Sequence, residues 1–241
     1  MSAQTMYERD AIATQLGSGQ ETRRQLPVRN CPKAALRDNS ASGAPCASSS
    51  DNYQSGQTYV LRIESALCSQ AFFDTACYEF YQVRLLNRAR PLNIQLHAYC
   101  LLSETVYLMM TPMTPTGLHE LLDSLNESYS EYFNLRFQRR RKVWQARTRL
   151  HPLPDNAICL DFQKYIERLP VDQNNHVHPG THPWSSYSRY AFDRVDSHLT
   201  MHPRFQRFRR MTGNPMGRYR DFIASPFNEQ YRQSLADTFC K

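Results

Sequence analysis

Two apolar, aromatic-rich runs lie almost end to end in the middle of this chain, at residues 94–102 and 106–110. Only three polar residues, Ser103, Glu104 and Thr105, separate the two runs. A spacer this short predicts a tight turn between two neighbouring strands. Any fold of this chain must therefore place these strands side by side and bury most of their side chains.

The remaining elements follow from local periodicity. Rows of β-branched and apolar residues predict strands, and apolar residues at three- and four-residue steps predict one buried helix face. We expect a strand at 59–63, helices at 72–88 and 117–137, a short segment near Leu150, a helix from Pro154 to about Leu169 stopped by Pro170, and short helices after residue 199. The order β-α-β-β-α-(β)-α predicts an α+β fold, a ferredoxin-like sandwich with an antiparallel sheet.

The N-terminal part of the chain differs in composition from the rest. Residues 38–57 are rich in Ser, Ala, Gly and Asn and have almost no apolar side chains. Such a stretch cannot bury enough surface to offset its ordering entropy. We expect a disordered extension at 1–56, a folded domain at 57–190 and a basic helical tail at 191–241.

Basic residues outnumber acidic ones, 29 to 22, which gives a formal net charge of +7. An arginine-rich excess suits a polyanionic partner, because a guanidinium donates two parallel hydrogen bonds to a phosphate. The chain has no apolar run of the about 20 residues that span a bilayer and no signal-peptide pattern. We therefore expect a cytoplasmic protein without a membrane partner. Seven cysteines without CxxC spacing argue against a disulfide framework or a zinc site.

Four motifs occur in a fixed order along the chain. They are HAYCLLSETVYLMMTP at 97–112, KVWQARTR at 142–149, KYIERLPV at 164–171 and HPWSSY at 182–187. In this order and at this spacing they resemble the REP-associated tyrosine transposases, bacterial single-strand DNA enzymes of the HUH superfamily. The resemblance covers roughly residues 59–235 and implies the same ferredoxin-like fold.

In that family a tyrosine hydroxyl attacks a phosphodiester of single-stranded DNA and becomes linked to the 5′-phosphate, assisted by a divalent metal. The resemblance places the nucleophile at Tyr165. It places the metal-binding His-hydrophobic-His strand on Thr105, Val106 and Tyr107, and a polar residue of the nucleophile helix on Leu169. Because the metal-binding side chains are replaced, the resemblance implies a degenerate member with impaired or lost catalysis, and no cofactor is expected.

The alternative is a working enzyme that cuts and rejoins single-stranded DNA with Tyr165 at an atypical Mg²⁺ or Mn²⁺ site. Glu104 has the hard oxygen atoms that Mg²⁺ prefers, although a single carboxylate on a turn is more often a solvated surface residue. His176 and His178 spell a His-x-His in a polar stretch that reads as a loop. A His-x-His in such a loop is a weak signal for a metal site.

The motif at 142–149 lies in a basic stretch that predicts contact with nucleic acid. Basic groups follow phosphates, and an indole ring can stack on an unpaired base. The candidate DNA-binding residues are Arg139, Arg140, Arg141, Lys142, Trp144, Arg147 and Arg149. For Trp144 a position in the core is an equally good interpretation.

The resemblance implies a DNA partner that is single-stranded or a hairpin with a single-stranded flank. We favour a DNA-binding protein over the working enzyme. A third interpretation is a regulatory protein that pairs with an intact transposase or forms an oligomer.

Overall fold

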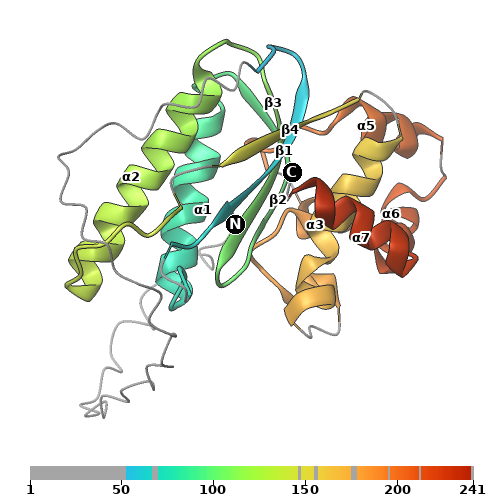
Figure 1. The fold of residues 1–241 in the computed structure, drawn as a ribbon. Helices are drawn as coiled ribbons and strands as arrows, with labels where there is room; N and C mark the ends of the chain where they lie inside the picture. Colours follow the sequence, from blue (N-terminus) through green and yellow to red (C-terminus); the bar gives the residue numbers. More distant parts are fainter. Residues whose placement is uncertain are drawn as a thin grey trace, which may run out of the picture. The chain divides into compact units, whose positions relative to one another are not determined.

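The computed structural model describes residues 53–66, 70–145, 148–154, 157–174, 178–194, 196–211 and 213–239, without the side chains of Arg149 and Asn174. Within these ranges four strands form one antiparallel sheet in the order β2-β3-β1-β4 (Figure 1). The strands are β1 (Thr58–Glu64), β2 (Ile94–Leu101), β3 (Thr105–Pro112) and β4 (Arg149–Leu153). This order confirms the ferredoxin-like topology that the sequence predicts.

Residues of β1 and β3 at the centre of the sheet point alternately to its two faces. Leu61 pairs with Leu108 and Ile63 with Val106, and all four side chains join one core. The intervening Val60 and Tyr107 belong to a second core on the opposite face. Because alternate strand residues point to opposite faces, a strand that is apolar at nearly every position is buried on both sides.

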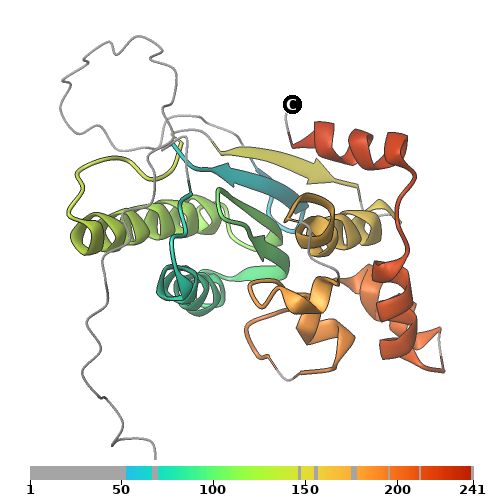
Figure 2. The same cartoon turned by 90° about the horizontal axis from the view of Figure 1, so that it is seen from below.

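Two helices cover the first face of the sheet (Figures 1 and 2). They are α1 (Thr75–Ala89) and α2 (Gly117–Phe137). Asp74 caps α1, since its side chain accepts a hydrogen bond from the backbone N–H of Cys77 at 3.0 Å. The helix faces that pack on the sheet carry the three- and four-residue apolar repeats seen in the sequence, which confirms both expected helices.

The opposite face of the sheet packs against α3 (Ile158–Asn174) and α7 (Glu229–Thr238). The expected stop of α3 at Pro170 is wrong, because the helix continues through this proline to Asn174. A proline removes one backbone hydrogen bond from a helix. Here Leu169 and Pro170 are buried, and Arg168 and Asp172 form an ion pair across the same turn at 3.1 Å. Burial and this pair offset the missing bond.

The HPWSSY segment runs beside the outer strand β2. The backbone N–H of Leu101 donates to the carbonyl of Trp184 at 2.9 Å, and that of Ser186 donates to Tyr99 at 3.0 Å. The ring of Trp184 also stacks on Tyr78 of α1 at 5.2 Å. The segment thereby fastens the following chain to the sandwich.

Beyond this segment, short helices pack around a third apolar cluster that contains Tyr187, Phe205 and Tyr219. They are α4 (Tyr187–Ala191), α5 (Pro203–Arg210) and α6 (Pro215–Ala224), preceded by the 3-10 turn η1 (Pro179–Thr181). None of the helices described is long and apolar enough to cross a bilayer.

Candidate nucleic-acid interface

Four consecutive basic residues, Arg139 to Lys142, follow the end of α2, and all four are exposed. The helix ends at Phe137, and the left-handed backbone of its cap residue Gln138 (φ 52°) turns the chain away. Asn134 then holds the segment, because its side chain donates to the carbonyl of Arg141 at 3.0 Å and accepts from the N–H of Arg141 at 3.3 Å. The guanidinium of Arg139 lies over the ring of Phe73, 5.1 Å from the ring centre. The basic groups therefore extend from a backbone that is already ordered.

These four residues are consecutive in the sequence, and we call them the α2-end cluster. Within the described residues none of the four has a carboxylate partner at ion-pair distance. The neighbouring Arg136 differs, since it pairs with Asp74 at 2.7 Å. The predicted Arg147 lies outside the described residues, as does the side chain of Arg149. Among the residues that the structure describes, the α2-end cluster is therefore a set of cations without ion-pair partners.

Trp144 lies in the first core of the protein and is 4% exposed. Its indole contacts the rings of Phe72, Tyr81 and Tyr129 at centroid distances of 5.4–5.6 Å. The side chain anchors the end of the basic stretch between α1, α2 and the sheet. Of the two interpretations of Trp144, base stacking and a position in the core, the structure shows the second. The ring has no free face that could stack on a base.

Three of the positions that the family resemblance singled out, Tyr107, Tyr165 and Leu169, lie on the second face of the sheet, whereas Val106 belongs to the first core. Tyr107 of β3 and Tyr165 of α3 meet edge to face, with ring centroids 6.5 Å apart. Phe239, after α7, stacks on Tyr165 at 5.6 Å and meets Tyr107 at 5.1 Å. Leu169 belongs to the same apolar cluster. The strand and the helix therefore bring these three side chains together, in a packed apolar and aromatic cluster.

Tyr165 is 2% exposed, and burial raises the pKa of its hydroxyl above the usual value. Burial also raises the pKa of Tyr107. Neither phenol is thus easily ionised, and Leu169 has no ligand atom. Among the residues that the structure describes, no group of three or more His, Cys, Asp or Glu side chains is arranged to hold a metal ion. The side chains at these positions do not fit the divalent cation that the family uses.

Of the alternative metal ligands, Glu104 and His178 lie away from this cluster, and the buried His97 is occupied by its own hydrogen bonds. Glu104 is exposed on the turn between β2 and β3. His178 caps the 3-10 turn η1, where its Nδ1 accepts from the N–H of Gly180 at 3.0 Å, while His176 lies outside the described residues. His97 is buried between Thr111 and the carbonyl of Thr200, each 2.8 Å from a ring nitrogen. Burial lowers the pKa of His97 to about 3, as suits a neutral, packed histidine.

Glu167, two residues after Tyr165, is a fully buried carboxylate between three segments of the chain. It accepts hydrogen bonds from the hydroxyl of Ser186 at 2.6 Å and from the hydroxyl of Tyr219 at 2.5 Å. Gln163 donates to the same tyrosine hydroxyl at 2.8 Å. Burial raises the pKa of Glu167 to about 7, and the hydroxyl donors act against this rise. In the sequence Glu167 is part of a motif only, and its polar helix neighbours Gln163, Lys164 and Arg168 give no sign that it is buried.

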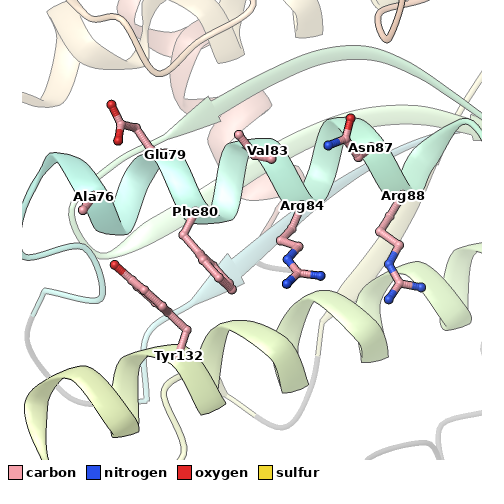
Figure 3. A pocket seen from close by; sticks show the side chains of 8 residues that line it. All are labelled: Ala76, Glu79, Phe80, Val83, Arg84, Asn87, Arg88 and Tyr132. Carbon is pink, nitrogen blue, oxygen red and sulfur yellow. The ribbon is translucent and has the colours of Figure 1, made fainter.

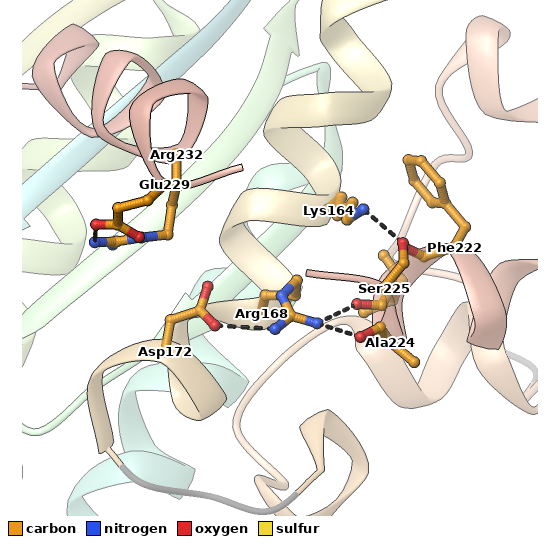
Figure 4. A network of polar contacts seen from close by, with 9 residues as sticks. Lys164, Arg168, Asp172, Phe222, Ala224, Ser225, Glu229 and Arg232 are labelled. Carbon is orange, nitrogen blue, oxygen red and sulfur yellow. Dashed lines mark hydrogen bonds and ion pairs between the residues drawn. The ribbon is translucent and has the colours of Figure 1, made fainter. Parts of the chain in front are cut away.

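Two cations of α3 hold α6 in place (Figure 4). Arg168 donates to the carbonyls of the last two residues of α6 at 2.8 and 2.7 Å, where the helix dipole favours positive charge. Lys164 donates to Ser225 at 2.8 Å and lies over the rings of Phe222 and Phe227. Both side chains are buried. The cations nearest to Tyr165 in sequence are therefore occupied in packing the C-terminal helices.

No protein-family model matches this chain, and no curated protein matches it. Among solved structures, a REP-associated tyrosine transposase bound to a REP hairpin is similar with a TM-score of 0.48 and 16% identity, covering 62% of this chain and 88% of the other. A bacterial tRNA(His) guanylyltransferase (Thg1)-like protein in complex with GTP has a TM-score of 0.32 and 12% identity. That likeness covers 54% of this chain and 67% of the other.

Proposed function

We propose that this protein binds single-stranded or hairpin DNA through the α2-end cluster and does not transfer phosphodiesters at Tyr165. The observation that carries the proposal is the set of four exposed cations on an ordered backbone, without carboxylate partners within the described residues. Phosphates supply the missing counter-charge, and their contacts release counterions from the DNA. The order of the four sequence motifs is the second support, since it is the order found in a family that handles such DNA.

Removing the charges of the α2-end cluster is expected to lower the affinity for DNA and to make that affinity less dependent on salt concentration. In the quadruple variant Arg139→Gln, Arg140→Gln, Arg141→Gln and Lys142→Gln, the slope of log affinity against log salt should fall by about 3, since each phosphate contact to a single strand contributes about 0.7. Fluorescence anisotropy with a labelled hairpin carrying a single-stranded flank measures both quantities.

A matched variant removes four exposed arginines from the C-terminal helices and the loop before them. The changes are Arg194→Gln, Arg207→Gln, Arg210→Gln and Arg218→Gln. This control should lose much less affinity than the α2-end variant. Equal losses in the two variants would mean that net charge alone drives binding, which contradicts an interface at the end of α2.

Tyr165→Phe is expected to leave DNA binding unchanged, because the phenol is buried among Tyr107 and Phe239. The parent protein should form no covalent adduct with hairpin DNA in the presence of Mn²⁺. Denaturing gel electrophoresis of the incubated mixture provides the measurement. An adduct that appears with the parent protein and disappears with Tyr165→Phe would establish the working enzyme instead.

A further inference from the structure

A groove of about 650 Å³ runs between α1 and α2, on the helix surfaces that do not pack on the sheet (Figure 3). Phe80 and Tyr132 form its aromatic wall, and Arg84 and Arg88 lie along the α1 side. Val83 is 53% exposed beside them. The groove thus combines two cations with apolar surface, and nothing in the functional proposal above uses it.

The aromatic wall orients the first of these cations. The rings of Phe80 and Tyr132 stack at 4.1 Å with an interplanar angle of 9°. The guanidinium of Arg84 lies 5.1 Å from the centre of the Phe80 ring, and that of Arg136 lies 5.9 Å from the centre of the Tyr132 ring. Cation–π contacts of this kind restrain a long side chain. Arg84 therefore loses less entropy than a free arginine when it binds a ligand.

The charges of the groove are unbalanced. Arg84 and Arg88 are four residues apart on one helix, so they repel each other across one turn. Neither has an ion-pair partner within the described residues. Glu79 is the acidic side chain among those lining the groove. An anion between the two guanidinium groups would relieve their repulsion.

The guanidinium groups over the rings of Phe80 and Tyr132 favour a nucleic-acid backbone over an acidic protein as the anionic partner. A protein partner usually anchors an aromatic or aliphatic side chain in an apolar hollow. Here Phe80 and Tyr132 stack on each other while guanidinium groups lie over both rings, so such a hollow is missing from the aromatic wall. The groove instead contains the planar guanidinium donors of Arg84 and Arg88, which suit phosphate, and the side chain of Val83 for an apolar contact.

We infer that this groove binds the phosphodiester backbone of single-stranded DNA, with Arg84 and Arg88 contacting neighbouring phosphates. The inference rests on the proposed function and adds to it a second contact surface, separate from the α2-end cluster. Cβ atoms one helical turn apart lie about 6 Å from each other, and the two flexible side chains can reach two phosphates of one strand from there.

Charge changes in the groove test the inference with a single-stranded oligothymidine in the anisotropy measurement. The double variant Arg84→Gln and Arg88→Gln should weaken binding roughly tenfold at low salt, and its salt slope should fall by about 1.4. Glu79→Gln removes the repelling carboxylate and should tighten binding about twofold. The matched double variant Arg207→Gln and Arg210→Gln should change affinity much less. Equal effects of the two double variants would overturn the inference.

A second measurement separates this inference from the proposed function. Methyl NMR signals of Val83 should shift when oligothymidine is added to the full chain, and they should still shift at higher concentration in the α2-end variant. If the Val83 signals do not move while oligothymidine binding still depends on the α2-end cluster, the inference about the groove is wrong and the proposed function stands. If oligothymidine binds neither surface, both proposals fail. If an oligoglutamate peptide moves the Val83 signals and oligothymidine does not, the groove is a protein-docking surface and the inference is wrong.

Discussion

Trp144→Ala is expected to lower the free energy of unfolding by about 3–5 kcal/mol, the range for truncating a large aromatic residue in a packed core. The indole is 4% exposed and contacts three aromatic rings, so its removal leaves a cavity into which these neighbours relax only partially. Urea unfolding followed by far-ultraviolet circular dichroism measures the loss. Trp144→Phe keeps most of the packing and should lose much less stability.

DNA affinity should respond differently from stability in these variants. Where Trp144→Phe is folded, its affinity for the flanked hairpin should stay within about twofold of the parent value, because the indole has no free face for a base. A base-stacking tryptophan contributes about 1–3 kcal/mol per base, which corresponds to at least a fivefold change. A fivefold or larger loss of DNA affinity in folded Trp144→Phe would mean that Trp144 contacts the DNA.

Glu167→Gln is expected to become more stable relative to the parent protein as the pH rises. The pKa of Glu167 is about 7 in the folded protein, against 4.5 for the free side chain. The folded state therefore binds this proton more tightly than the unfolded state does. The protonated Glu167 contributes fully to the unfolding free energy of the parent protein below pH 4.5, and this contribution is lost as the pH rises through about 7. Over that window the difference in unfolding free energy should grow by up to about 3 kcal/mol.

The glutamine variant can keep the buried hydrogen bonds. Its amide oxygen can accept from Tyr219 while its amide nitrogen donates to Ser186, since a hydroxyl both donates and accepts. Urea unfolding of both proteins between pH 4.5 and 8 provides the difference, in which the contribution of His97 cancels. Glu104→Gln, at an exposed turn position, is the control. Parallel stability curves for Glu167→Gln and the parent would contradict a protonated carboxyl in the core.

Local sequence pattern accounts for most of the architecture. The two runs around residues 103–105 became β2 and β3, and the apolar repeats expected at 72–88 and 117–137 became α1 and α2. These features are predictable because strand and helix periodicity report which side of each element is buried. The basic run at 139–142 was also readable as exposed, since four adjacent cations without apolar spacing have no core face.

Only the tertiary structure decided what surrounds each of these side chains. Periodicity says that a face is buried but not which distant residue covers it, and Phe239 comes from the far end of the chain to pack on Tyr165. The partners of Glu167 lie 19 and 52 residues away, so its raised pKa could not be read from its neighbours. Trp144 is buried in the core and α3 continues past Pro170 for the same reason. The free energy of long-range packing exceeds the local preferences that a sequence pattern reports.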